Sequence, residues 1–191
     1  PAAVIGMSGV MPQSEDLEIF WQHLKEGKNL VTEIPRDRWD WREYDGDPAR
    51  DPGKTRIKWG GFMKGADKFD PLFFNISPRE AELLDPQMRI FLQTVWQAIE
   101  DAGYSAAQLS GSNLGVFVGV STLDYRELLH GVAEAGAEQF SFMIANRVSY
   151  TLNLHGPSEA IDTACSSSLV SVHRAVEALQ NGTCEMAIAG G

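Results

Sequence analysis

Cys165 is the residue in this sequence best placed for covalent chemistry. It stands in the segment E-A-I-D-T-A-C-S-S-S-L-V-S-V-H, residues 159–173, between an apolar strand-like run and a helical pattern. A cysteine in the first turn of a helix lies near unpaired backbone N–H groups, which favour the thiolate. A thiolate there is suited to acyl transfer through a thioester, and the backbone N–H of Cys165 could donate one hydrogen bond to the oxyanion.

The neighbours of Cys165 strengthen this hypothesis, although an unpaired cysteine is more often a buried and inert thiol. Asp162 or Thr163 is expected to cap the helix, which would place Cys165 at a strand-to-helix turn that substrates can reach. The small residues at 164 and 166–168 leave room for an acyl chain. Both interpretations of Cys165, nucleophile and buried filler, therefore remain open at this point.

No other residue near Cys165 in the sequence is an obvious catalytic partner. His173 lies more than two helical turns further on. His155 stands beside Gly156 and Pro157 and is expected to make a hydrogen bond within a loop, whereas His23 and His130 are expected at the surface. Cys184 begins an apolar strand, so we expect it to be buried.

The elements that would position Cys165 alternate between strands and helices. Apolar residues spaced by three and four predict helices, and short apolar runs predict strands. Ser77 and Asp85, each followed by proline, are expected to start helices. The predicted strands are 3–7, 114–120, 158–164 and 184–191. The predicted helices are 16–26, 85–102, 140–152 and a helix that opens at Cys165 and continues through 169 to 182. This order indicates an α/β fold with helices packed against a mixed or parallel sheet.

Residues 35–71 interrupt this pattern. They are rich in Pro, Gly, Asp and aromatic residues and show no helical or strand period, so we predict a loop-rich excursion. Aromatic side chains are expected to pin these loops, namely Trp39, Trp41, Tyr44 and Trp59. Residues 36–58 carry seven basic and six acidic side chains, which we expect to pair with one another.

The composition excludes several classes of protein. The 191 residues carry a net charge of −10, which argues against nucleic acid or an anionic membrane as partner. No apolar run approaches the roughly 20 residues of a membrane span, and the first residues lack the features of a signal peptide. Two cysteines form no disulfide framework, so a cytoplasmic location is expected, and the four histidines show no metal-binding spacing.

The segment I-D-T-A-C-S-S-S-L resembles the active-site segment of β-ketoacyl synthase (ketosynthase) domains in modular polyketide synthases. Further segments are similar to the same family in the same order, across residues 1–191: V-I-G-M-S-G, F-D-P-L-F-F-N-I-S-P-R-E-A-E-L-L-D-P-Q-M-R-I-F-L, W-Q-A-I-E-D-A-G-Y, G-V-F-V-G-V-S and A-N-R-V-S-Y. The tract E-I-P-R-D-R-W-D-W-R-E-Y-D-G-D-P resembles the branch whose acyltransferase is a separate protein, the trans-acyltransferase type.

The resemblance implies a thiolase-like α/β/α/β/α layered fold, of which residues 1–191 would be the N-terminal half, in a domain that works as a homodimer. It implies that Cys165 accepts the acyl chain from the phosphopantetheine arm of an acyl carrier protein. The chain would then be extended by decarboxylative condensation with a carrier-bound malonyl unit. Partners would be the carrier protein and flanking polyketide synthase domains, and no metal or nucleotide cofactor is implied.

The family's two catalytic histidine segments, H-G-T-G-T and N-I-G-H, do not occur in the sequence. They are expected downstream of residue 191, so this chain would be able to accept an acyl group but not to condense it. Two alternatives remain open. One is a non-condensing ketosynthase or a structural or docking half-domain that at most transfers acyl chains. The other is a cysteine hydrolase or another acyltransferase of the same fold.

Overall fold

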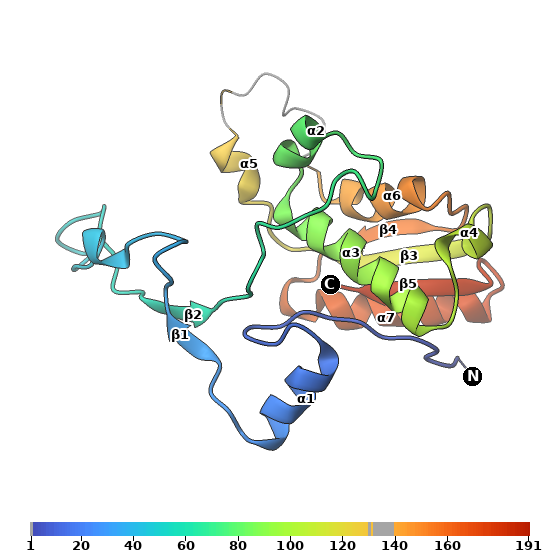
Figure 1. Ribbon diagram of the computed structural model, residues 1–191, viewed down its shortest axis with the longest axis horizontal. Helices are drawn as coiled ribbons and strands as arrows, with labels where there is room; N and C mark the ends of the chain where they lie inside the picture. Colours follow the sequence, from blue (N-terminus) through green and yellow to red (C-terminus); the bar gives the residue numbers. More distant parts are fainter. Residues whose placement is uncertain (1, 130, 132–139) are drawn as a thin grey trace. The chain divides into compact units, whose positions relative to one another are not determined.

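The computed structural model describes residues 2–129, 131 and 140–191 (Figure 1). The chain divides into two compact units, residues 1–8 with 67–191 and residues 9–66. The larger unit contains a three-stranded sheet and Cys165, and the smaller unit contains most of the loop-rich excursion. No helix in the described part of the chain is long and apolar enough to cross a membrane.

A three-stranded parallel sheet forms the centre of the larger unit, in the order β4-β3-β5 (Figure 1). The strands are β3 (Leu114–Gly119), β4 (Ser158–Ile161) and β5 (Met186–Gly190). Val118 pairs with Ala160 of β4 and with Gly190 of β5. The middle strand is buried on both faces, as its continuous apolar sequence predicts.

Helices cover both faces of this sheet, which confirms the predicted α/β class. On one face, α3 (Pro86–Asp101) and α6 (Phe142–Thr151) share a core with alternate residues of β3, namely Leu114, Val116 and Val118. On the other face lies α7 (Ser167–Gln180), where Ala175 and Ala178 pack with Phe117. Leucine and valine therefore fill one side of β3, whereas small residues let α7 approach the other side closely.

The starts of two helices are formed by the residues that the sequence indicated. Ser77 accepts a hydrogen bond at its Oγ from the N–H of Glu80 (3.1 Å), at the start of α2 (Pro78–Leu83). Asp85 accepts one from the N–H of Gln87 (2.8 Å), at the start of α3. Two short helices, α4 (Ala106–Leu109) and α5 (Tyr125–Leu128), complete this unit.

The predicted strand over residues 3–7 is wrong for the described chain. These residues have no regular structure, and Val4 is 80% exposed. Instead, the N–H of Met7 donates to the carboxylate of Asp101 at 2.8 Å, and Gly6 lies against the backbone of α3 at Ala98. An apolar run becomes a strand only where another strand satisfies its backbone, and in this unit α3 occupies that position.

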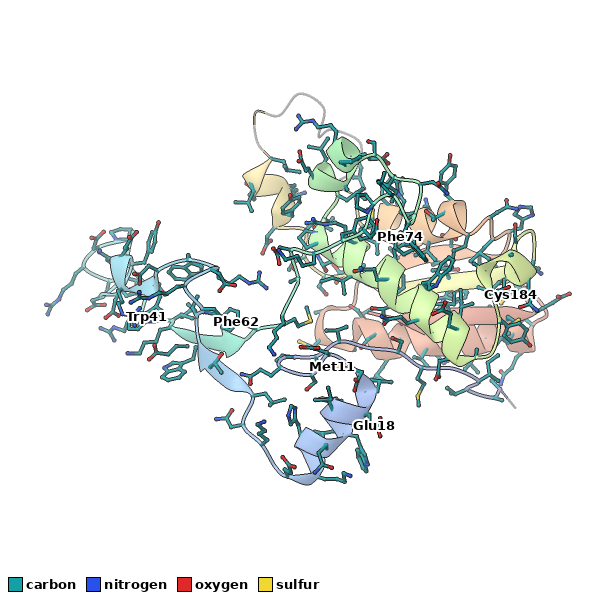
Figure 2. All side chains as sticks on the ribbon, in the orientation of Figure 1. Met11, Glu18, Trp41, Phe62, Phe74 and Cys184 are labelled. Atoms are coloured by element: carbon teal, nitrogen blue, oxygen red, sulfur yellow. The ribbon has the colours of Figure 1, made fainter. Side chains whose placement is uncertain are left out.

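The smaller unit contains α1 (Leu17–Lys25), β1 (Val31–Glu33), the short 3₁₀-helix η1 (Trp41–Glu43) and β2 (Trp59–Gly61). The strands β1 and β2 pair antiparallel. The charged residues of the excursion pair locally, as expected: Arg42 with Asp40 (3.3 Å) and Arg56 with Asp47 (3.0 Å). Trp41 is labelled in Figure 2 and lies under two cations, the side chains of Arg42 and Lys58.

Candidate functional site

Cys165 lies on a turn at the carboxyl end of the sheet. The chain leaves β4 at Ile161, passes through the one-turn 3₁₀-helix η2 (Ala164–Ser166) and continues directly into α7 at Ser167. The side chain of Cys165 is exposed. The carboxyl ends of parallel strands are where open α/β sheets bind their ligands. The interpretation of Cys165 as a buried filler is therefore wrong for this chain, and its role as a nucleophile stays a prediction.

The predicted helix start is partly right and partly wrong. The carboxylate of Asp162 accepts a hydrogen bond from the N–H of Ala164 at 3.0 Å, so Asp162 does cap the turn. Thr163 is the residue before η2, but its side chain forms no capping bond with the backbone. Its hydroxyl instead contacts the Oγ of Ser166 at 2.9 Å. The α-helix proper also begins later than expected, so Cys165 precedes α7 rather than occupying its first turn.

The backbone of this turn is strained immediately before the cysteine. Ala164 has a φ of +54°, in the left-handed region. For residues other than glycine this conformation costs about 1–2 kcal/mol, because Cβ crowds the following carbonyl oxygen. Such strain persists only where surrounding contacts impose it, and it is typical of functional sites.

The turn leaves one backbone donor free next to the sulfur. Within the described part of the chain, the N–H of Cys165 donates to no acceptor. A free N–H next to a nucleophile can stabilise the oxyanion that forms when the nucleophile attacks a carbonyl. An uncommitted donor at this position is one requirement of the predicted oxyanion role, which stays a prediction.

Gly119, the last residue of β3, lets α7 start directly against the sheet. A Cβ at this position would lie 2.7 Å from the backbone carbon of Ser167 and 2.7 Å from the nitrogen of Ser168. Real Cβ atoms do not approach backbone so closely. Because Gly119 has no side chain, residues 162–166, the turn that carries Cys165 (the cysteine turn), can lie this close to β3.

The two cysteines lie at opposite ends of the parallel strands. Cys184, labelled in Figure 2, precedes β5 at the amino-terminal ends, whereas Cys165 follows β4 at the carboxyl ends. Cys184 is only 3% exposed, which confirms its predicted burial, and this burial raises the pKa of its thiol. A buried thiol with a raised pKa is a poor nucleophile.

The structure brings none of the described histidines to Cys165 by a hydrogen bond. His155 bonds within its loop, as predicted, through its ring to the side chain of Asn153 (3.2 Å), and its backbone N–H donates to the carbonyl of Ser112 before β3 (2.9 Å). His173 lies 3.6 Å from the carboxylate of Glu177 on α7. His23 belongs to the smaller unit, where its ring contacts Ser14, and His130 lies outside the described residues.

Metal ligation finds no support in the described residues, since they contain no group of three His, Cys, Asp or Glu side chains that could hold an ion. The sequence analysis missed Ser121, whose hydroxyl lies 3.2 Å from the carboxylate of Asp162. The sequence held a positional signal: Ser121 follows the predicted strand 114–120, and Asp162 lies near the end of the predicted strand 158–164. Residues that follow neighbouring parallel strands meet at the same edge of a sheet.

Comparison with known proteins places this arrangement among the ketosynthases. A family model described as "Beta-ketoacyl synthase, N-terminal domain" matches residues 1–191. The chain is 56% identical to part of polyketide synthase PksN of Bacillus subtilis, over its full length but only 4% of PksN. It is 50% identical to part of polyketide synthase ThaG of Burkholderia thailandensis, over 99% of this chain and 3% of ThaG.

Solved structures of ketosynthase domains are also similar to this chain. The ketosynthase domain OzmH KS7 of oxazolomycin biosynthesis from Streptomyces albus superposes with a TM-score of 0.86 at 47% identity, covering 98% of this chain and 33% of that one. The ketosynthase from module 6 of the bacillaene synthase of B. subtilis gives 0.86 at 42% identity, covering 97% and 31%. The chain thus spans about a third of these solved domains and a few per cent of the curated synthases.

Proposed function

Because the chain belongs to the β-ketoacyl synthase family and matches its N-terminal domain, we propose that it is the acyl-accepting part of a polyketide chain-extending ketosynthase. The observation that carries this proposal is the placement of Cys165: an exposed thiol after a strained alanine, at the carboxyl edge of a parallel sheet. An exposed sulfur next to an unused backbone N–H has the two properties that acyl transfer to cysteine needs.

In the first step, the thiolate of Cys165 attacks the carbonyl carbon of an acyl thioester carried on a phosphopantetheine arm. A C–S bond forms to Cys165, the bond to the pantetheine sulfur breaks, and that sulfur leaves as a thiol after taking a proton. The negative charge on the carbonyl oxygen is met by the N–H of Cys165 as one donor. The small residues around the turn, Ala164 and Ser166–Ser168, leave space for the acyl chain.

In the second step, a carrier-bound malonyl unit loses CO₂, and its α-carbon forms a bond to the acyl carbonyl carbon while Cys165 leaves as the thiolate. The product is a β-ketoacyl thioester that is longer by two carbons. This step needs groups that handle charge and protons, which we expect from the two histidine segments of the family downstream of residue 191. The described residues supply only the first step.

The partners and setting follow from the same proposal. The acyl carrier protein brings the phosphopantetheine arm, so the chain itself holds no cofactor and no metal. We place the complete domain in the cytoplasm as a homodimer, between other domains of a polyketide synthase. The acyltransferase is a separate protein, since the tract at residues 33–48 resembles that branch of the family.

The test is mass spectrometry of the complete synthase domain after incubation with acyl-loaded carrier protein. We expect the mass of one acyl group on the peptide containing Cys165, no acylation of Cys165→Ala, and normal acylation of the control Cys184→Ala. Acyl loading by Cys165→Ala at the wild-type rate would refute the assignment.

The same experiment separates the alternatives when malonyl-loaded carrier protein is added. A β-keto product two carbons longer supports chain extension. A loaded chain that is never extended indicates a non-condensing ketosynthase. Release of the free acid indicates a hydrolase, and the absence of any loading would leave a structural or docking half-domain.

A further inference from the structure

A hydrogen-bond network of three side chains surrounds the cysteine turn. Ser167 is its centre and is only 6% exposed. Its Oγ accepts from the N–H of Thr163 (2.9 Å) and donates to the carbonyl oxygen of Ala164 (2.7 Å). These two bonds span the turn that carries Cys165, from Thr163, two residues after the end of β4, to Ser167 at the start of α7.

The second anchor comes from the ends of two strands. The carboxylate of Asp162, after β4, accepts from the N–H of Ala164 at 3.0 Å. The hydroxyl of Ser121, after β3, lies 3.2 Å from the same carboxylate oxygen, 3.3 Å from the carbonyl of Ala164 and 3.4 Å from the Oγ of Ser167. Ser121 therefore connects the cysteine turn to the central strand of the sheet.

This network holds the backbone of Ala164 in place. Both of its backbone polar groups are bonded: the N–H donates to Asp162, and the carbonyl accepts from the side chains of Ser167 and Ser121 and from the backbone N–H of Ser167. Its φ of +54° is unfavourable for alanine, so without these bonds the residue would relax to negative φ. That rotation would turn the following peptide group, which contains the N–H of Cys165.

We propose that Ser167, Asp162 and Ser121 are positioning residues: by holding Ala164 at positive φ, they aim the N–H of Cys165 at the oxyanion of the incoming thioester. None of the three touches the reacting atoms in this role. The proposal rests on the proposed function, because it presupposes that Cys165 is acylated. It extends that function by assigning roles to three residues outside the nucleophile.

The test compares two reactions of the same sulfur in the complete domain. Acyl loading from acetyl-pantetheine thioester passes through an oxyanion, whereas alkylation by iodoacetamide needs only an accessible thiolate. Loss of alignment should therefore slow loading and leave alkylation nearly unchanged. For Ser167→Ala we expect the maximal loading rate to fall about ten- to a hundredfold. The half-saturating thioester concentration should stay unchanged, and alkylation should change less than about threefold.

Matched variants separate positioning from general damage. Ser171→Ala is the control for Ser167→Ala, because the Ser171 Oγ is also buried and bonded, to the carbonyls of Ser168 and Gly190, but does not contact the cysteine turn. Asp162 is exposed, so Asp162→Ala should fold normally and still load slowly. Asp162→Asn keeps an oxygen that can accept from Ala164 and should restore most of the loading rate.

The outcomes are distinct. If Ser167→Ala and Asp162→Ala load as fast as Ser171→Ala, the positioning role is wrong while the role of Cys165 stands. If loading and alkylation fall together in both variants, the network only maintains the fold, and the proposal is also wrong. If Cys165→Ala still loads, the proposed function itself fails, and the rates of the Ser167 and Asp162 variants lose their meaning.

Discussion

Replacing Gly119 by alanine tests most directly whether close contact between β3 and α7 places the cysteine turn. The added Cβ would lie 2.7 Å from backbone atoms of both Ser167 and Ser168. To reach ordinary van der Waals contact, at 3.4 Å or more, the start of α7 must move by at least about 0.7 Å. Backbone cannot rotate aside as the end of a flexible side chain can, so the helix start itself has to shift.

Two effects of this shift can be estimated. Overpacking of this kind costs about 1–3 kcal/mol of unfolding free energy. Because the moved segment follows Cys165 directly, acylation should also slow, by up to about a hundredfold for a displacement near 1 Å. The assays are the midpoint of chemical denaturation of the complete domain and the rate of acyl loading measured by mass spectrometry.

Gly190→Ala is the matched control for this substitution. Gly190 lies on the neighbouring strand β5, where a new Cβ would meet only the ring of Phe91, at an ordinary distance of 3.5 Å. We expect it to change the unfolding free energy by less than about 0.5 kcal/mol. If Gly119→Ala gave the same midpoint and loading rate as Gly190→Ala, close contact at Gly119 could not be what places the turn.

Four further predictions use other features of the chain. Ala164→Gly should raise the free energy of unfolding by up to about 1 kcal/mol, because glycine adopts positive φ without strain. The same change should slow acyl loading, because glycine holds the turn less rigidly, and faster loading would contradict this. Iodoacetamide should label Cys165 about a hundredfold faster than Cys184, which reacts only during local opening, and equal rates by peptide mass spectrometry would refute the assignment. Burial raises the pKa of the Cys184 thiol above its unfolded-state value, so the contribution of this thiol to stability is complete below the unfolded-state pKa and is lost as the pH rises through the folded-state pKa. Cys184→Ala should therefore flatten the alkaline fall of the denaturation midpoint, and an unchanged slope would count against this. Residues 36–58 are nearly neutral within a strongly acidic chain, so we infer that this tract is a docking area for a carrier protein that is itself acidic. Reversing the exposed charge of Arg38 to Glu should slow loading from such a carrier about two- to tenfold and leave loading from free acetyl-pantetheine unchanged. Equal rates from the carrier would exclude the tract from docking.

Sequence patterns predicted those parts of the fold that depend on local physics. The start of α3 was predictable because Asp85 and Pro86 act on their own helix, and β3 because its apolar run needs cover on both faces. The cysteine turn was predictable as a position but not in detail. Whether Thr163 or Asp162 caps the turn depends on Ser166, which contacts the hydroxyl of Thr163.

The strand wrongly predicted over residues 3–7 and the overlooked Ser121 have one physical origin: the structure at both places depends on partners that are distant in sequence. The run at residues 3–7 has the composition of a strand, but a strand also needs a neighbour, and that segment contacts Asp101 of α3 instead. Ser121 carries no motif, and its position after a predicted strand does not identify its partner. Pairing of β3 with β4 places its hydroxyl 3.2 Å from the carboxylate of Asp162.

The parallel pairing of β3 and β4 also implies an order of folding. Ser121 and Asp162 are 41 residues apart in the chain, and a parallel pair can form only after the crossover between its strands has closed. Contacts of such long range are slow to form, because the entropy of loop closure is lost before the contact compensates it. The hydroxyl of Ser121 and the carboxylate of Asp162 are therefore expected to meet late in folding, so a nascent or partly folded chain would expose the Cys165 thiol before the turn around it is complete.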